Sequence, residues 1–371
     1  MSLLLSLFVV VVAVQCSYYI VFSLSFPSKK ISLTPTSQTT DKIPISVIIC
    51  AKNEASNLDL LLPSLLDQQY TAPLEFVLVD DNSTDSTAAV LKKYTVLDKR
   101  IKTISIVKNN KQIQSKKQAL AEGINQANFN HILCTDADCK PLGKYWIRNI
   151  SQQFSETKKI VLGYGAYEKV GNSFLNKLIR YETLLTAMQY FSYAICGHPY
   201  MGVGRNLAYT KELFKKNGGF LSHEKIASGD DDLFINQVAT KINTVVCLEK
   251  QSFTVSKVKT TYKDWIRQKR RHISTSSYYK NSHKLLLGLF YLSQIAFPIL
   301  TCSLLILEAN ISILLFMILT RYTAYMNAVS RWSNQLNEKD LLLTAPLTEI
   351  TLIFMQLFLL IKNLIARPQR W

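Results

Sequence analysis

The sequence of 371 residues has no CxxC pair and no histidine motif of the kind that holds zinc, although it contains seven Cys and five His. It also lacks a recognised nucleic-acid-binding module, so the net charge of +17 is the only feature that would support a nucleic-acid partner. We therefore expect neither a zinc site nor a nucleic-acid partner. We interpret the cysteines as reduced, mostly buried thiols of a cytoplasmic protein. The positive charge is interpreted as solvated surface and attraction to anionic membrane lipids.

Charge is absent from residues 3–22, and a helix of this length crosses roughly 30 Å of hydrocarbon. A cleaved signal peptide is the alternative interpretation. The apolar run is long, however, no basic residue precedes it, and Lys29 and Lys30 follow it. We therefore predict an uncleaved anchor over residues 1–26, followed by a polar linker over residues 27–43.

The last part of the chain, residues 274–371, is apolar again and is predicted to contain two or three membrane segments. Residues 285–307 form a run long enough to span. Residues 311–326 are shorter, and Arg321 interrupts the end of this run. Residues 341–361 contain Pro346 and Glu349, so we expect them to lie partly in the interface before crossing.

The distribution of Lys and Arg predicts that the central region lies in the cytoplasm. We expect an integral membrane protein of a bacterial inner (cell) membrane. The connection at residues 308–310 lacks Lys and Arg, as an outside turn should. The C-terminal tail conflicts with this rule, because Lys362, Arg367 and Arg370 would face outward if three C-terminal helices crossed. Either one segment does not cross, or the tail breaks the rule.

Between the apolar ends, short β-branched runs alternate with segments of helical periodicity. Strands are predicted at residues 45–49, 76–79, 101–107 and 131–134, and helices at 57–69, after 83–85, and at 116–127. This alternation predicts an α/β domain with a parallel sheet flanked by helices, a layout that binds nucleotides. Polar residues after the strands are then expected to line a ligand crevice.

Three acidic clusters follow this pattern: Asp80-Asp81, Asp136-Ala137-Asp138 and Asp230-Asp231-Asp232. A carboxylate pair such as Asp136 and Asp138 suits Mg²⁺ or Mn²⁺, and such an ion stabilises a departing nucleoside diphosphate. The third cluster suits a general base that takes a proton from an acceptor hydroxyl. Helix capping is the plainer interpretation of the third cluster, but it accounts for only one or two of the three carboxylates.

These motifs resemble the processive and lipid-linked membrane branch of family-two inverting glycosyltransferases, which includes ceramide glucosyltransferase-like enzymes. The resemblance covers residues 44–273, from Val47-Ile48-Ile49-Cys50-Ala51-Lys52-Asn53-Glu54 to Gln268-Lys269-Arg270-Arg271-His272. It implies a GT-A nucleotide-sugar-binding domain with a mixed, mainly parallel sheet and with transmembrane helices on either side. It also implies a hexosyltransferase that uses a nucleotide sugar, with UDP-sugars as the expected donors, and a divalent metal ion.

The resemblance also implies a role for each residue that matches a motif. The residues expected to bind the nucleotide sugar are Glu54, Asp80, Asp81, Lys116, Asp136, Gln268 and Arg271. Asp136 and Asp138 would hold the metal. Asp231 would be the base, with Asp230 and Asp232 as rivals. Gly204, Asn206 and His272 would lie on the acceptor side. Ser115 replaces the glycine of the family's GKxxAL motif.

One departure bears on the acceptor, since the family's QxxRW motif ends in His272 where tryptophan is usual. The same segment can also be interpreted as a basic interface helix, with Trp265 as a membrane-level anchor. The acceptor is expected to be a lipid or a lipid-linked glycan, because three or four spans are few for a polysaccharide channel. A polysaccharide synthase subunit and a non-catalytic nucleotide-sugar-binding scaffold remain the alternatives.

Overall fold

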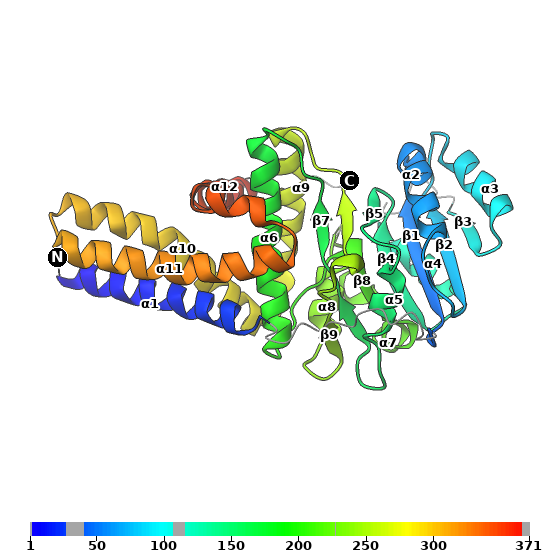
Figure 1. Ribbon diagram of the computed structural model, residues 1–371, viewed down its shortest axis with the longest axis horizontal. Helices are drawn as coiled ribbons and strands as arrows, with labels where there is room; N and C mark the ends of the chain where they lie inside the picture. Colours follow the sequence, from blue (N-terminus) through cyan, green and yellow to red (C-terminus); the bar gives the residue numbers. More distant parts are fainter. Residues whose placement is uncertain (1, 27–40, 107–115, 227, 366–371) are drawn as a thin grey trace.

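The computed structural model describes residues 2–26, 41–106, 116–226 and 228–365, without the side chains of His272 and Leu364. An α/β domain occupies one end of the molecule and long helices occupy the other (Figure 1). Ser115, Arg367, Arg370 and most of the predicted linker therefore lie outside the described residues.

The first half of the α/β domain alternates strands and helices as predicted. Its elements are β1 (Ile45–Ala51), α2 (Ala55–Leu66), β2 (Leu74–Asp80), α3 (Thr87–Leu97), β3 (Ile101–Ser105), α4 (Lys116–Gln126) and β4 (His131–Asp136). The helix predicted after residues 83–85 begins at Thr87, where Asp85 Oδ1 accepts a hydrogen bond of 2.9 Å from the Thr87 N–H. The predicted elements are thus confirmed, with shifts of a few residues at their ends.

The second half adds shorter strands and the helices that close the domain. Its elements are β5 (Cys139–Pro141), α5 (Trp146–Ser151), β6 (Ile160–Leu162), β7 (Gly165–Tyr167), α6 (Phe174–Ile195), η1 (Gly204–Asn206), β8 (Leu207–Thr210), α7 (Lys211–Lys216), α8 (Asp232–Val238), β9 (Thr244–Val246), β10 (Thr254–Ser256) and α9 (Tyr262–Thr275). The main sheet has the order β3-β2-β1-β4-β8-β6-β9, and a smaller sheet has the order β5-β10-β7.

The main sheet is mixed, because β8 runs antiparallel to both of its neighbours while β1, β2, β3 and β4 pair in parallel. Both faces of β1 are buried. Val47 packs with α2 and α5 on one side, and Ile48 packs with α4 on the other. Burial on both faces explains why the strand is a continuous apolar run rather than an alternating one. The parallel pairing brings Ala51 beside Asp80 and Cys50 beside Asp136, so the strand ends meet at one edge.

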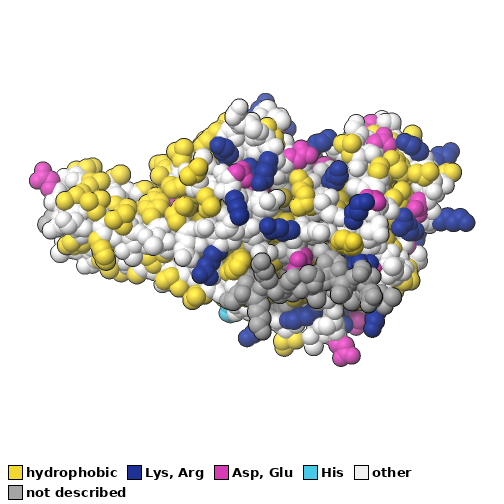
Figure 2. Space-filling model, in the orientation of Figure 1, with side chains coloured by type: hydrophobic (Ala, Val, Ile, Leu, Met, Phe, Trp, Pro, Cys, Tyr) yellow, Lys and Arg dark blue, Asp and Glu magenta, His cyan; other side chains and the backbone are white. Residues whose placement is uncertain are grey.

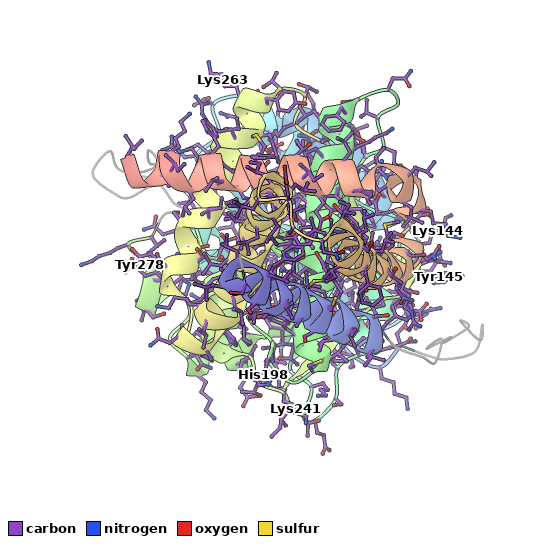
Figure 3. All side chains as sticks on the ribbon, turned by 90° about the vertical axis from the view of Figure 1, so that its left-hand side faces the viewer. Lys144, Tyr145, His198, Lys241, Lys263 and Tyr278 are labelled. Carbon is purple, nitrogen blue, oxygen red and sulfur yellow. The ribbon has the colours of Figure 1, made fainter. Side chains whose placement is uncertain are left out.

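Within the described residues, four helices are long and apolar enough to cross a membrane: α1 (Ser2–Leu24), α10 (Asn281–Ile306), α11 (Ile311–Gln335) and a stretch that comprises η5 (Lys339–Thr344) and most of α12 (Ala345–Ile365). α1, α10 and α11 lie side by side as a bundle (Figure 1). α12 instead runs across the bundle, as the view along the bundle shows (Figure 3). It packs on α6, α9 and η5.

Arg321 interrupts the apolar run of residues 311–326 but not the helix, because α11 continues to Gln335. The guanidinium is buried and satisfied within the helices. It donates to Gln15 Oε1 at 2.7 Å and to Glu349 Oε2 at 2.8 Å. A charge paired in this way does not end an apolar helix, since helix capping and backbone geometry decide where a helix ends.

The bundle and the domain share one apolar core. Phe22 of α1 and Trp332 of α11 belong to the same buried cluster as Ile48 of β1 and Tyr190 of α6. Lys and Arg side chains gather on the surface where the bundle meets the domain, whereas the bundle is largely apolar (Figure 2). The expectation of mostly buried thiols is only partly met. Cys134, Cys139 and Cys247 are buried, Cys16 and Cys50 are half-buried, and Cys196 and Cys302 are exposed.

Candidate active site

The edge where the parallel strands end opens into a cavity of about 930 Å³. Most of the site residues predicted from the sequence line this one cavity. They are Glu54, Asp81, Lys116, Asp136, Asp138, Gly204, Asp230, Asp231, Gln268 and Arg271. Residues from both halves of the domain therefore face a single space, which is as large as a small-molecule ligand site.

Glu54 and Asp81 line the part of the cavity next to β1 and β2. The backbone N–H of Asp81 donates to the Ala51 carbonyl at 2.8 Å, which holds the two strand ends together. Glu54 is half-buried, and this burial raises the pKa of its carboxyl, although a hydrogen bond from Asn57 lowers it. The Glu54 N–H donates to Thr87 Oγ1 at 2.9 Å, which joins the start of α2 to the start of α3.

Asp80 does not line the cavity, contrary to its prediction as a ligand-binding residue. Its side chain is buried, and Oδ1 accepts a hydrogen bond of 3.0 Å from the Ser83 N–H. This bond closes a turn in which Asn82 adopts a positive φ of 59°. Aspartate commonly stabilises such turns through its own side chain, so Asp80 shapes the turn that presents Asp81.

Asp136 and Asp138 lie at the end of β4 and offer oxygen atoms to one point. Carboxylate oxygens of these two residues and the Cys139 Sγ lie within 4.8 Å of one another. Burial, followed by the charge of Asp136, raises the pKa of Asp138. The Cys139 thiol contacts Ser256 Oγ at 2.9 Å, and its burial raises its pKa, so it stays a protonated thiol. The two carboxylates fit a hard divalent cation, and the thiol does not.

Lys116 joins the second and third acidic clusters. Its Nζ forms an ion pair with Asp136, and it lies 3.3 Å from Asp230 Oδ2. Burial disfavours the charge on Lys116, but the two carboxylates raise its pKa well above the usual value. The same lysine holds the pKa of Asp230 below its ordinary value, against the effect of burial. A positive charge therefore lies between the second and third acidic clusters within the cavity.

The three aspartates of the third cluster have different partners, which separates their roles. Asp230 pairs with Lys116. Asp232 accepts hydrogen bonds from Thr275 and from Tyr279, the latter at 2.7 Å, and so ties α8 to the end of α9. Asp231 caps α8, and its Oδ2 accepts a hydrogen bond of 2.7 Å from the Gly204 N–H.

The protonation of Asp231 is the most informative in the cluster. Burial, together with the neighbouring charges of Asp230 and Asp232, raises its pKa to about 7, although the Gly204 N–H opposes the rise. A carboxyl that ionises near neutral pH within a cavity can act as a general base. The geometry thus favours Asp231 over its two neighbours for that role.

Asn206 is fully buried and does not line the cavity, so its prediction as an acceptor-side residue is wrong. Its amide donates to the carbonyls of Tyr164 at 2.9 Å and Ser252 at 2.7 Å, and its Oδ1 accepts from Trp146 Nε1 at 3.0 Å. These bonds fix the backbone that carries Gly204. A buried amide with all these partners supports the site without touching a ligand.

The Gln-x-x-Arg residues lie on α9, which covers the cavity. Gln268 Nε2 donates to the Tyr167 hydroxyl at 3.4 Å, and Arg271 lines the cavity. The His272 side chain lies outside the described part of the chain, so its predicted role stays a prediction. Trp265 is not a membrane-level anchor, because it is buried and its Nε1 donates to Glu182 at 3.3 Å.

The sequence-based assignment missed several residues that line the cavity. Arg205 stacks over the Tyr167 ring, 4.2 Å from its centroid, and donates to the Ala166 carbonyl at 2.9 Å. Glu182 forms an ion pair with Lys269 at 2.8 Å and so joins α6 to α9. A charged residue within the largely apolar segment of residues 174–195 was the available signal for Glu182.

The cavity also reaches the membrane helices. Its walls there are Leu287, Gly288, Tyr291 and Ile295 of α10 and Gln356, Leu357 and Leu360 of α12. The acidic site of the α/β domain is therefore continuous with an apolar space between membrane-type helices.

Comparisons with known sequences match the part of the chain that forms the α/β domain. Residues 46–218 match the family described as Glycosyl transferase family 2. An uncharacterized glycosyltransferase of Haemophilus influenzae is 43% identical over 61 residues, which cover 16% of this chain and 19% of that protein. The 4,4'-diaponeurosporenoate glycosyltransferase of Staphylococcus aureus is 30% identical over 112 residues, or 30% of this chain and 28% of that protein. The chain therefore matches less than a third of the length of each of these curated relatives.

Among solved structures, a mannosyltransferase of Pyrobaculum calidifontis in complex with GDP-Man and Mn²⁺ aligns over 94% of this chain and 99% of that one. The TM-score is 0.57 and the sequence identity 16%, so the likeness concerns the fold. It confirms the predicted GT-A architecture. Residues 46–218 are thus similar to family 2 glycosyltransferases, and the α/β domain around them has the GT-A fold.

Proposed function

We propose that this protein is an inverting, metal-dependent glycosyltransferase that moves a sugar from a nucleotide sugar to a lipid or lipid-linked acceptor at a membrane. The observation that carries this proposal is the single cavity that joins the carboxylates of the α/β domain to the apolar walls of α10 and α12. Such a cavity brings a water-soluble donor and a membrane-borne acceptor to the same carboxylates. The proposal assigns the chain to the lipid-linked branch that includes ceramide glucosyltransferase-like enzymes.

The donor is proposed to bind across the strand ends. Glu54 and Asp81 contact the nucleoside, while Lys116, Gln268 and Arg271 contact the diphosphate. Asp136 and Asp138 hold Mg²⁺ or Mn²⁺, which supplies positive charge to the departing diphosphate. Lys116 supports this arrangement, because its ammonium already contacts Asp136 and Asp230.

The transfer is proposed to be a single displacement with Asp231 as the base. The Asp231 carboxylate takes the proton of an acceptor hydroxyl, and the hydroxyl oxygen forms a bond to the anomeric carbon. The bond from that carbon to the phosphate oxygen breaks, and the nucleoside diphosphate leaves with the electron pair. The Gly204 N–H holds one oxygen of Asp231, which orients the carboxylate for this transfer.

The membrane topology is proposed to have three spans, α1, α10 and α11, with α12 along the cytoplasmic surface. The direction of α12 across the bundle supports this (Figure 3). The tail that follows α12 then starts on the side of the catalytic domain, so its basic residues follow the positive-inside rule. The sequence left open whether one C-terminal segment does not cross the membrane or the tail breaks the positive-inside rule. We propose the first possibility, with α12 as the segment that does not cross.

The test is release of a nucleoside diphosphate by the full chain in detergent, across a panel of donors with Mn²⁺ or EDTA. UDP-sugars come first, and GDP-Man is included because a protein of similar fold binds it. We expect Mn²⁺-dependent release from one donor, lost in Asp138→Asn. If no donor is turned over and calorimetry detects no donor binding, the glycosyltransferase proposal is wrong.

A further inference from the structure

Gly288 of α10 is a glycine that helix packing does not explain. Glycine costs about 1 kcal/mol relative to alanine in a helix, and in membrane helices it usually allows two backbones to approach closely. A Cβ at position 288 would meet no atom within 4 Å, so no neighbouring helix requires its absence. Gly288 is half-buried and lines the cavity. The missing side chain therefore leaves open space at the edge of the cavity.

The space beside Gly288 lies between two apolar helix faces. Tyr291 and Ile295 follow Gly288 at spacings that place them on the same face of α10. Leu357 and Leu360 line the opposite side from α12, and Leu360 is 48% exposed. Gly288 lies seven residues after the start of α10, or roughly 10 Å along the helix, within its apolar run. The part of the cavity beside Gly288 thus lies next to the apolar stretch of α10.

A polar group is placed inside this opening. Gln189 of α6 is 1% exposed and lines the cavity. Its Oε1 accepts a hydrogen bond of 3.3 Å from the Tyr291 hydroxyl. Among the described residues, its Nε2 has no hydrogen-bond partner. A buried amide N–H without a partner costs free energy, so an oxygen atom of a ligand is its natural partner.

We propose that the gap between α10 and α12 at Gly288 is a lateral entrance for the hydrocarbon chain of the acceptor, and that Gln189 Nε2 donates a hydrogen bond to an oxygen of its head group. The inference rests on the proposed function, and it names the part of the acceptor that this site recognises. Gly288 determines whether a chain can pass, and Gln189 positions the polar end on the way to Asp231.

The first test uses the full chain in phosphatidylcholine vesicles with a long-chain alcohol that carries a photoreactive diazirine. Label on the buried segment of α6 around Gln189 reports a chain that has entered the cavity. We expect this label in the wild type, where it is competed away by hexadecanol, and in Gly288→Ala. It should be lost in Gly288→Phe, whose ring fills the gap. Leu292→Phe is the matched control, because Leu292 is 67% exposed and does not line the cavity.

The second test addresses Gln189 by comparing two competitors of the same chain length, hexadecanol and hexadecane. Hexadecanol should compete about fivefold better in the wild type, as expected for one hydrogen bond, and equally well in Gln189→Met. Label on α6 that persists in Gly288→Phe, or is absent from the wild type, overturns the entrance. An unchanged preference in Gln189→Met overturns the role of Gln189.

Release of nucleoside diphosphate is measured on the same samples, which separates the two proposals. If the donor is turned over but α6 is not labelled, the proposed glycosyltransferase function is supported and the proposed entrance is overturned. If α6 is labelled but no donor is turned over or bound, the cavity is supported as a lipid site and the proposed glycosyltransferase function is overturned.

Discussion

The carboxylate of Asp231 accepts a hydrogen bond of 2.7 Å from the backbone N–H of Gly204. The two residues come from motifs that lie 27 positions apart, and the buried amide of Asn206 fixes the segment that carries Gly204. The second oxygen of Asp231, Oδ1, accepts a hydrogen bond of 2.7 Å from the Asp232 N–H. The carboxylate is thus held by backbone donors on both oxygens, which restricts its rotation within the cavity.

Replacement of this base gives the first prediction. Asp231→Asn should lower kcat by about 10²- to 10⁴-fold, because the amide cannot take the acceptor proton. The Kd of the donor, measured by calorimetry, should change little, since Asp231 is assigned to the acceptor. A kcat within threefold of the wild type would show that Asp231 is not the base.

The pKa of Asp231 gives a prediction for pH. A base acts when it is deprotonated, so activity should be high above about pH 7 and fall as the carboxyl is protonated at lower pH. The kcat/KM for the acceptor should then fall about tenfold for each pH unit below that value. The residual rate of Asp231→Asn should not show this fall in kcat/KM at low pH. A wild-type profile that stays flat down to pH 5 would contradict the assignment.

Lys116 gives a prediction that does not depend on turnover. Lys116→Met removes the cation between Asp136 and Asp230, so the metal-free protein should lose up to about 3 kcal/mol of unfolding free energy. Mn²⁺ should restore the thermal midpoint more strongly in this variant than in the wild type, because it replaces the missing positive charge. Thermal unfolding in detergent with EDTA or Mn²⁺ measures both effects.

The control for this experiment is Lys169→Met. Lys169 pairs with Asp340 at 2.8 Å, and both side chains are more than 40% exposed, so the loss should stay below about 1 kcal/mol. An equal response of both variants to Mn²⁺ would rule out the proposed relation between Lys116 and the metal site.

The buried pair of Arg321 and Glu349 predicts a strong coupling between helices. Arg321→Met should destabilise the protein by about 3–5 kcal/mol, because it leaves the Glu349 carboxylate buried without its partner. Adding Glu349→Gln should recover much of that loss, since no charge then remains buried. If the two losses simply add, the pair does not hold α12 against the bundle.

The direction of α12 gives a prediction for topology. In a background without cysteine, Lys362→Cys and Lys263→Cys should react with an impermeant maleimide from the same side of the membrane. Glu308→Cys, between α10 and α11, should react from the opposite side. Reaction of Lys362→Cys from the side of Glu308→Cys would mean that α12 crosses the membrane.

Much of this arrangement could be predicted from residue patterns, because strands and motifs are local signals. The run at residues 45–49 predicts β1 since a strand buried on both faces must be apolar throughout. The acidic clusters predict a shared site since parallel strands end at one edge. Asp81 and Asp136 line one cavity for that reason, whereas Asp231 reaches the same cavity from the start of α8.

The remaining features depend on contacts between distant segments, which no local pattern contains. Asp80 and Asp81 are adjacent residues of the same type. The turn at Asn82 places the Asp80 carboxylate against the backbone and the Asp81 carboxylate at the cavity, and the sequence alone does not show this difference. Arg321 looks like an interruption until Glu349 is placed beside it. Likewise, the composition of residues 341–361 cannot tell a spanning helix from one that lies across a bundle.

The most direct test of the account is transfer of a radiolabelled sugar into the solvent-extractable lipid of vesicles that contain the full chain and the donor found in the panel. We predict Mn²⁺-dependent incorporation by the wild type, stopped by EDTA and reduced at least about 100-fold in Asp231→Asn. Label that enters only a water-soluble glycan, or lipid labelling that Asp231→Asn leaves unchanged, would contradict the account.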